Sequence, residues 1–250
     1  MSRRVAAIDC GTNSVRLLIG QAAESGFSEV DRDLHLTRLG QGVDATGMFA
    51  PEALARTLDA VADFGGRIRA AGAARVRFVA TSAARDASNR DEFFAGVRER
   101  VGVDAETISG EDEARLSFTG ALSVASDVEW PVLVMDIGGG STELVLGRPD
   151  ADGALTIVAG RSLDVGSVRL RERFLHSDPP TPAEVAEAAS YVDALIDASG
   201  VPVEQARAWI GVGGTATALS AINLGLASYD RARVQGSTMT REQVQSVTPR

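Results

Sequence analysis

Apolar residues along the chain follow two different periods, and the alternation of these periods predicts the fold class. Four short apolar runs are typical of buried strands, and they cover residues 5–8, 75–81, 132–135 and 209–212. Four longer segments repeat their apolar residues at helical spacing, and they cover residues 51–71, 89–101, 111–124 and 182–198. Further strands are expected over residues 28–39, 103–108 and 162–165, and a further helix over residues 167–175. Because strands and helices alternate in both halves, we expect an α/β protein with two sheets.

An internal repeat divides the chain. Residues 9–20 align without a gap with residues 136–147, at a constant offset of 127, and the shared positions include Asp, Gly, Ser, Leu and a final Gly. Each copy follows an apolar run, so each predicts a strand, a tight glycine-rich turn and a returning strand. Because the offset is about half of the chain, we expect two related domains, residues 1–125 and 126–250, whose two turns face each other across a cleft.

The amino-acid composition excludes several classes of catalytic and metal-binding site. All 25 positively charged residues are arginine, which excludes a Walker phosphate loop with its lysine, a Schiff-base lysine and a lysine general base. Cys10 is the only cysteine, which excludes internal disulfides and thiolate zinc sites. His35 and His176 lie far apart in the sequence, and this separation disfavours a zinc hydrolase.

The balance of charge bears on partners. The formal net charge is −9, with 34 acidic residues, and neither half of the chain is basic. We therefore expect neither nucleic acid nor a membrane as a partner, and an anionic small substrate has to be attracted by a local site. No apolar run reaches transmembrane length and the N-terminus has no signal-peptide pattern, so we expect a cytoplasmic protein.

The two glycine-rich turns are candidate phosphate-binding sites. They contain Gly11, Thr12, Asn13 and Ser14 in the first copy and Gly138, Gly139, Gly140 and Ser141 in the second. A backbone without Cβ atoms approaches a ligand closely, and its N–H groups form a concavity suited to phosphate oxygens. One copy alone is equally well explained as an ordinary hairpin turn. Two copies, each preceded by an aspartate, favour phosphate binding.

Three carboxylates belong to the same two copies. Asp9 and Asp136 end apolar strands, where a carboxylate needs a partner or a metal ion. Glu143 lies on the returning strand and is expected to point back towards the turn. Three carboxylates near bound phosphates are the ingredients of a Mg2+ site. The alternative is that each aspartate only accepts hydrogen bonds from the amides of its own turn.

Three further motifs stand at strand ends or helix starts. Arg85 follows a buried strand and is suited to bind a phosphate through two N–H groups, although a surface ion pair with a nearby aspartate explains it almost as well. Glu113 is the third acidic residue of a helix start; the helix dipole alone explains Glu111 and Asp112, whereas Glu113 is either one more such residue or a functional carboxylate. Gly213, Gly214 and Thr215 form either a second kind of phosphate cradle or a tight turn capped by threonine.

These motifs, in this order and spacing, resemble the exopolyphosphatase/guanosine pentaphosphate phosphohydrolase (Ppx/GppA) family of the acetate and sugar kinase/Hsp70/actin superfamily. The resemblance covers nearly the whole chain, and the second hairpin with its trailing glutamate is the most specific part. It implies two ribonuclease-H-like (actin-like ATPase) domains with the active site in the cleft between them. It also implies an enzyme that releases terminal phosphate from inorganic polyphosphate or removes the 5′ γ-phosphate of guanosine pentaphosphate (pppGpp).

The resemblance also implies roles for single residues. Glu113 would activate or orient the attacking water, and Asp136 and Glu143 would help to hold a divalent metal ion, Mg2+ or Mn2+, with Asp9 close to it. The two turns and Arg85 would grip the phosphates. Members of the family continue beyond the end of this chain, so we expect the second domain to be incomplete at its C-terminus. A homodimer is expected, and a non-catalytic polyphosphate- or nucleotide-binding protein is the alternative from a different class.

Overall fold

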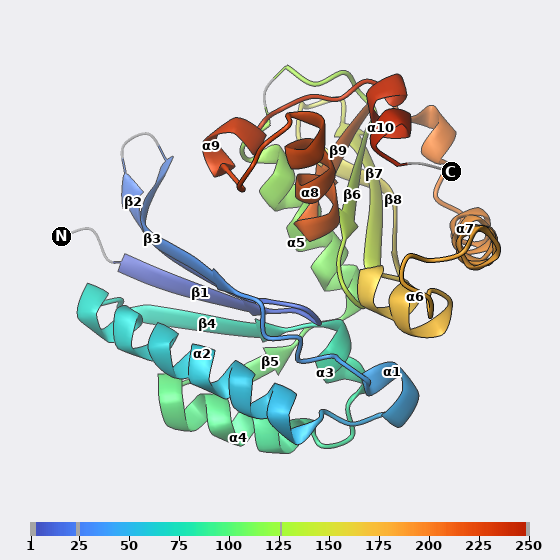
Figure 1. The fold of residues 1–250 in the computed structure, drawn as a ribbon. Helices are drawn as coiled ribbons and strands as arrows, with labels where there is room; N and C mark the ends of the chain where they lie inside the picture. The colour runs from blue at the N-terminus through green and yellow to red at the C-terminus, as the bar shows by residue number, and fades with distance from the viewer. Residues whose placement is uncertain (1–3, 24–25, 126, 249–250) are drawn as a thin grey trace. The chain divides into compact units, whose positions relative to one another are not determined.

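The chain forms two compact units, each with its own sheet. The structure, a computed structural model, describes residues 4–23, 26–125 and 127–248 (Figure 1). The units are Met1–Ser109, with a five-stranded sheet, and Gly110–Arg250, with a four-stranded sheet. The expected α/β class with two sheets is confirmed. The domain boundary predicted after residue 125 stays a prediction, and the helix Gly110–Leu122 packs against the second sheet.

The first unit alternates strands and helices. Its elements are β1 (Arg4–Cys10), β2 (Val15–Ala23), β3 (Gly26–His35), α1 (Val43–Thr46), α2 (Pro51–Ala71), β4 (Arg75–Ala80), α3 (Ser82–Asp86), α4 (Arg90–Val101) and β5 (Ala105–Thr107). Helix α2 has the predicted bounds because Pro51 occupies its first turn and Gly72, in the left-handed conformation, ends it. The strand predicted over residues 28–39 ends at His35.

The second unit repeats the scheme. Its elements are α5 (Gly110–Leu122), β6 (Val132–Ile137), β7 (Thr142–Pro149), β8 (Leu155–Leu163), α6 (Ser167–Arg173), α7 (Pro182–Ala198), η1 (Val203–Gln205), β9 (Ala208–Val212), α8 (Gly213–Asn223), α9 (Arg231–Val234) and α10 (Arg241–Val247). Helix α7 begins with a capping box between Thr181 and Glu184. No helix among the described residues is both long enough and apolar enough to cross a bilayer.

Sheet topology confirms the internal repeat. The strand orders are β3-β2-β1-β4-β5 and β8-β7-β6-β9, so the first four strands of one sheet correspond to the four of the other. β1 pairs with β2 antiparallel and with β4 parallel, and β6 pairs in the same way with β7 and β9. The register shifts after Ile19 in one copy and after Leu146 in the other, positions that the offset of 127 relates. Even the irregularity is therefore repeated.

The core of the first unit lies between its sheet and a pair of helices. Helices α2 and α4 run side by side along one face of the sheet (Figure 1). Phe64, Phe78 and Phe93 are fully buried there. The rings of Phe78 and Phe93 lie edge to face, 6.0 Å between centroids. Edge-to-face packing suits the charge distribution of aromatic rings and adds to the free energy of burial.

The central strands β6 and β7 of the second sheet are buried on both faces. Along β6, Val132 and Val134 pack towards α5 with Phe118, whereas Leu133 packs on the opposite face towards α7. This alternation follows from the two-residue period of a strand. Because the period continues past Val134, the side chain of Asp136 falls on the face that α5 covers.

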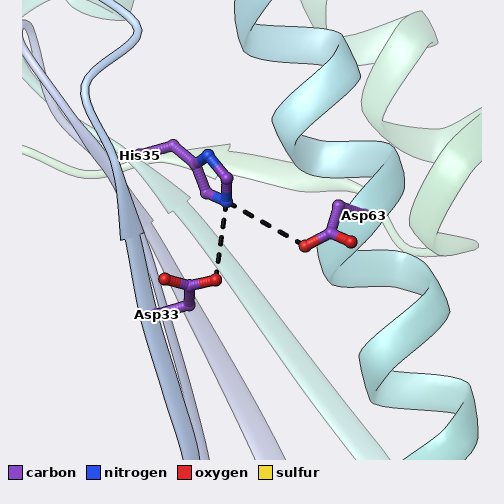
Figure 2. A group of neighbouring side chains, drawn as sticks. All are labelled: Asp33, His35 and Asp63. Atoms are coloured by element: carbon purple, nitrogen blue, oxygen red, sulfur yellow. Dashed lines mark ion pairs between the residues drawn. The ribbon is translucent and has the colours of Figure 1, made fainter.

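An ion-pair cluster fastens α2 to the edge strand β3 (Figure 2). His35 Nε2 lies 3.5 Å from Asp33 Oδ2 and 3.9 Å from Asp63 Oδ2. The guanidinium of Arg67 donates to both oxygens of Asp31, at 2.9 and 2.7 Å, and also to Asp33, while its Nη1 lies 3.8 Å from Asp63 Oδ2. Arg67 thereby lowers the pKa of Asp31. Arg67 contacts the same two carboxylate oxygens as His35, namely Asp33 Oδ2 and Asp63 Oδ2. Its guanidinium therefore supplies the positive charge that balances these carboxylates.

The aromatic core of the first unit gives a stability prediction. We expect Phe93→Ala to lower the free energy of unfolding of this unit by roughly 3–5 kcal/mol, since the truncation leaves a cavity beside Phe78. Met48 is 50% exposed, so Met48→Ala is the matched control and should change the free energy by less than about 1 kcal/mol. Urea unfolding followed by circular dichroism measures both. Equal losses in the two variants would contradict this account of the core.

Candidate active site

A row of polar side chains crosses the second sheet at the ends of its strands. Asp136 on β6 is the register partner of Glu143 on β7, and Glu143 is the register partner of Ser162 on β8. Register partners point to the same face of a sheet. The face is the one that α5 covers, because Val134 and Val145, each two residues away, pack there with Ala114 and Phe118 of α5. The row therefore lies beneath the start of α5.

Helix α5 brings the side chains of Ser117 and Glu113 to this row. Ser117 Oγ donates a hydrogen bond to Asp136 Oδ2 at 2.6 Å, and Ser162 Oγ donates one to Glu143 Oε1 at 2.7 Å. Glu113 lies one helical turn before Ser117, on the same side of α5. The close approach depends on Gly110, since a Cβ there would lie 2.6 Å from Ser162 Cβ. Helix and sheet thus hold three carboxylates together.

The surroundings of Glu143 disfavour its negatively charged form. Its side chain is only 2% exposed. Burial raises its pKa to about 8, and the negative charges of Glu113 and Asp136 act in the same direction, against hydrogen bonds from Ser162 and Ser141. A buried group of carboxylate oxygens that repel one another is the donor set that a hard divalent cation prefers. Asp136 and Glu143 therefore have the chemistry of divalent-metal ligands, and their metal role, like the role of Glu113 towards water, stays a prediction.

The equivalent row in the first unit is neutralised. Asp9 on β1 is the register partner of Arg16 on β2, and Arg16 Nη1 lies 3.3 Å from Asp9 Oδ2. By the offset of 127, Arg16 corresponds to Glu143. The two copies share a backbone but differ in charge at this position, so the like-charged pair occurs only in the second unit. The predicted metal role of Asp9 stays a prediction.

The second glycine turn presents its N–H groups. Gly138 N–H donates to Ser141 O at 3.0 Å, and the N–H groups of Ser167 and Val168 bind the carbonyl oxygens of Gly138 and Gly139 at 3.0 and 2.9 Å. Within the described part of the chain, the N–H groups of Gly139 and Gly140 have no recorded acceptor. These N–H groups are suited to an anion, and phosphate binding by Gly138, Gly139, Gly140 and Ser141 stays a prediction.

The first glycine turn is built in the same way. Gly11 N–H donates to Ser14 O at 2.9 Å, the equivalent of the bond in the second turn. The carbonyl oxygen of Thr12 accepts the N–H of Gly40 at 2.8 Å, and that of Asn13 accepts the N–H of Thr37 at 3.1 Å. As in the second turn, a later segment binds the carbonyl oxygens.

Arg85 lies near the first turn in the fold. Thr81 N–H donates to Cys10 O at 3.2 Å, which joins the end of β4 to the strand that leads into the turn. Helix α3, which the sequence did not predict, follows and carries Arg85. Its Nη1 donates to the carbonyl oxygen of Ile108 at 3.1 Å, so this guanidinium has a protein partner. Phosphate binding by Arg85 stays a prediction.

The Gly213–Thr215 segment lies against the carboxylate row. Helix α8 begins at Gly213, directly after β9. Gly213 has a φ of 86°, and a Cβ there would lie 2.6 Å from Asp136 Oδ1 and 2.7 Å from Ile137 O. Gly214 and Thr215 follow in the first turn of α8, where a Cβ on Gly214 would meet nothing within 4 Å. A side chain would therefore be strained and crowded at Gly213 but would have room at Gly214.

The structure therefore sorts the predicted site residues into two groups. The second unit brings together Glu113, Asp136, Glu143 and Gly213, whereas the first unit holds Asp9, its own glycine turn and Arg85. Sequence reasoning missed Ser117 and Ser162. The spacing of four from Glu113 is a signal for Ser117, whereas Ser162 is found only from the strand register.

Two adjacent glycines allow a matched test of the site. Gly213→Ala should lower the melting temperature, because alanine is strained at a positive φ and its Cβ would collide with Asp136 and with backbone. Gly214→Ala should leave the melting temperature unchanged or raise it, since alanine stabilises a helix where space is open. Differential scanning calorimetry measures both variants. The geometry at Asp136 would be wrong if Gly213→Ala were the more stable of the two.

Glu143 makes the stability of the metal-free protein depend on pH. The ordinary pKa of a glutamate is 4.5 and that of Glu143 in the fold is about 8, so between these values the folded protein holds a proton that the unfolded chain releases. Stability should therefore fall as the pH rises from about 5 to about 8. Glu143→Gln should flatten this slope, and Glu111→Gln should keep it. Melting temperatures measured over this range in EDTA would refute the assignment if both variants kept the slope.

Comparison with known proteins identifies several relatives of this chain. Exopolyphosphatase 2 of Mycobacterium tuberculosis is 48% identical over 242 residues, covering 92% of this chain and 74% of that protein. A guanosine-5′-triphosphate,3′-diphosphate pyrophosphatase of Photobacterium profundum is 33% identical and covers 88% of this chain and 43% of that protein. The crystal structure of an exopolyphosphatase-like protein superposes with a TM-score of 0.94 at 45% identity, covering 98% of this chain and 76% of that one.

The profile of the Ppx/GppA phosphatase family matches residues 18–250, which is most of the chain. The match includes the second glycine turn, the carboxylate row and the start of α8. The resemblance identified from the sequence motifs is confirmed. The chain belongs to the Ppx/GppA phosphatase family.

Proposed function

We propose that this protein is an exopolyphosphatase, which releases orthophosphate from the end of inorganic polyphosphate. The observation that carries the proposal is the cluster of Glu113, Asp136 and the buried Glu143, since three repelling carboxylates are suited to a divalent cation and to a water molecule beside it. The 48% identity with a protein named exopolyphosphatase 2 supports polyphosphate as the substrate. The proposal includes Mg2+ as the cofactor, with Mn2+ as a substitute, a cytoplasmic location and a homodimer.

The proposed reaction is phosphoryl transfer to water. The oxygen of a water molecule attacks the terminal phosphorus, the bond from this phosphorus to the bridging oxygen breaks, and the shortened chain leaves with the bridging oxygen. Glu113 orients the water and accepts its proton. In such reactions most of the catalysis comes from positioning and from neutralising charge on the phosphoryl oxygens.

The remaining residues bind and orient. Asp136 and Glu143 hold the divalent ion, which supplies positive charge to the phosphate oxygens when bound, and the proposal keeps Asp9 as a further metal residue. Ser117 and Ser162 fix the rotamers of Asp136 and Glu143 through their hydrogen bonds. The N–H groups of the two glycine turns, Arg85, and the start of α8 at Gly213, Gly214 and Thr215 bind phosphate oxygens. Positive charge from arginine is needed locally because the chain has a net charge of −9.

A second candidate function is hydrolysis of the 5′ γ-phosphate of guanosine pentaphosphate. The similarity to a guanosine-5′-triphosphate,3′-diphosphate pyrophosphatase favours it. The same carboxylates and turns would serve this reaction, because the bond that breaks is again a phosphoanhydride. A protein that only binds polyphosphate or nucleotide is the third candidate, and it has no need of Glu113 beside the carboxylate row.

Glu113 separates the enzyme from the binding protein. Glu113→Gln should slow phosphate release at least about 100-fold, the usual scale for loss of a general base, while folding and ligand binding persist. Glu111→Gln is the matched control, because Glu111 is exposed on the same helical turn, and it should keep full activity. Near-normal turnover in Glu113→Gln would refute the proposed role.

The assay for both variants measures orthophosphate release with Mg2+ and with EDTA. Short polyphosphate, long polyphosphate, guanosine pentaphosphate and ATP are compared in parallel. Metal-dependent release from polyphosphate is the expected result. Release from the guanosine nucleotide alone would favour the second candidate, and no release from any substrate by folded protein would favour the third.

A further inference from the structure

A short segment after β3 is bound to the first glycine turn. The carbonyl oxygen of Asn13 accepts the N–H groups of both Thr37 and Arg38, at 3.1 and 3.0 Å. Two residues further on, Gly40 N–H donates to Thr12 O at 2.8 Å. Three backbone hydrogen bonds thus place the Cα of Arg38 beside the turn, well within the length of an arginine side chain.

Arg38 has an unusual backbone conformation. Its φ is 52°, in the left-handed region that favours glycine and is costly for arginine. Glycine would be the low-energy residue here. Strained residues of this kind cluster at sites of function, where the side chain is needed. The side chain of Arg38 is exposed, and within the described part of the chain no hydrogen bond or ion pair is recorded for its guanidinium.

Two buried hydroxyl groups beside Arg38 also lack protein partners. Thr12 and Thr37 are 7% and 3% exposed, and their Oγ1 atoms have no hydrogen-bond partner among the described residues. A buried hydroxyl without a partner costs free energy, so such groups are normally satisfied by water or by a ligand. Both hydroxyls belong to the turn or to the segment bound to it. Both hydroxyls are therefore available to a water molecule or a ligand at the turn.

We infer that Arg38 is a phosphate-binding residue, which contacts a phosphate group of the phosphoanhydride substrate held at the first glycine turn. The inference rests on the proposed function and adds a residue to it. An acidic protein without lysine has to attract a polyanion through individual arginines, and the guanidinium binds phosphate oxygens through paired N–H groups. Arg16 is already paired with Asp9, and Arg85 with Ile108 O, whereas Arg38 has no recorded partner among the described residues.

The variants below distinguish the effect of the guanidinium charge of Arg38 from the effect of its strained backbone. Arg38→Gly removes the guanidinium and relieves the strain, Arg38→Lys restores a positive charge, and Arg90→Gly is a control that removes another exposed arginine of the same unit. All are made in the Glu113→Gln background, so that inorganic tripolyphosphate can be titrated calorimetrically with Mg2+ present. If hydrolysis persists in that background, the same comparison is made on KM.

We expect Arg38→Gly to weaken tripolyphosphate binding about ten- to hundredfold, the usual range for loss of a charged hydrogen bond, with an unchanged or higher melting temperature. Arg38→Lys should recover part of the affinity, and Arg90→Gly should bind as the parent does. Unchanged affinity in Arg38→Gly overturns the inference, as does an equal loss in Arg90→Gly. A lower melting temperature in Arg38→Gly overturns it in favour of a structural role. If the parent neither binds tripolyphosphate nor releases phosphate with Glu113 restored, the proposed function itself fails.

Discussion

Burial of Glu143 between Asp136 and Glu113 is the interaction on which the second unit depends. The strand register places Glu143 and Asp136 on one face, and α5 then covers that face with a third carboxylate. Three neighbouring negative charges, one of them fully buried, are tolerated only when a proton or a cation neutralises part of them. Ser117 and Ser162 orient the carboxylates but do not remove the charge. The fold therefore creates a site around Glu143 where a proton or a cation has to neutralise negative charge.

The two units share a backbone architecture but differ in the charge of one side chain in the strand that follows the glycine turn. Their strand orders, turn hydrogen bonds and register shifts correspond, so the backbone is held in common. At the equivalent register position one unit has Arg16 and the other has Glu143, and the aspartate beside it is therefore paired in one and repelled in the other. A single side chain therefore sets the charge at this register position in each unit. The first unit keeps the features that suit an anion, with its glycine turn and exposed arginine.

Much of this could be predicted from the sequence, because strong local signals specified it. The repeat, the bounds of α2 and the capping box of Thr181 each follow from a few adjacent residues. Other features depend on contacts between distant residues. β8 extends well before the strand predicted over residues 162–165, because its pairing with β7 outweighs a weak local pattern. The orphaned hydroxyl of Thr37 and the conformation of Arg38 arise from docking on a turn that is remote in sequence.

The register shift between β7 and β8 also sets limits on how this hairpin can change in evolution. Beyond the shift, Gly147 pairs with Ile157, whereas before it Leu146 pairs with Ala159, so Val158 is the additional residue. Insertions in the connection between the strands add length on the far side of this residue and leave the pairing of Ser162 with Glu143 intact. A single deletion between Val158 and Ser162 would be absorbed by loss of the bulge, whereas any further change of length there would disrupt the pairing of the two strands. Length variation among relatives is therefore expected at the tip of the hairpin and not along its inner part.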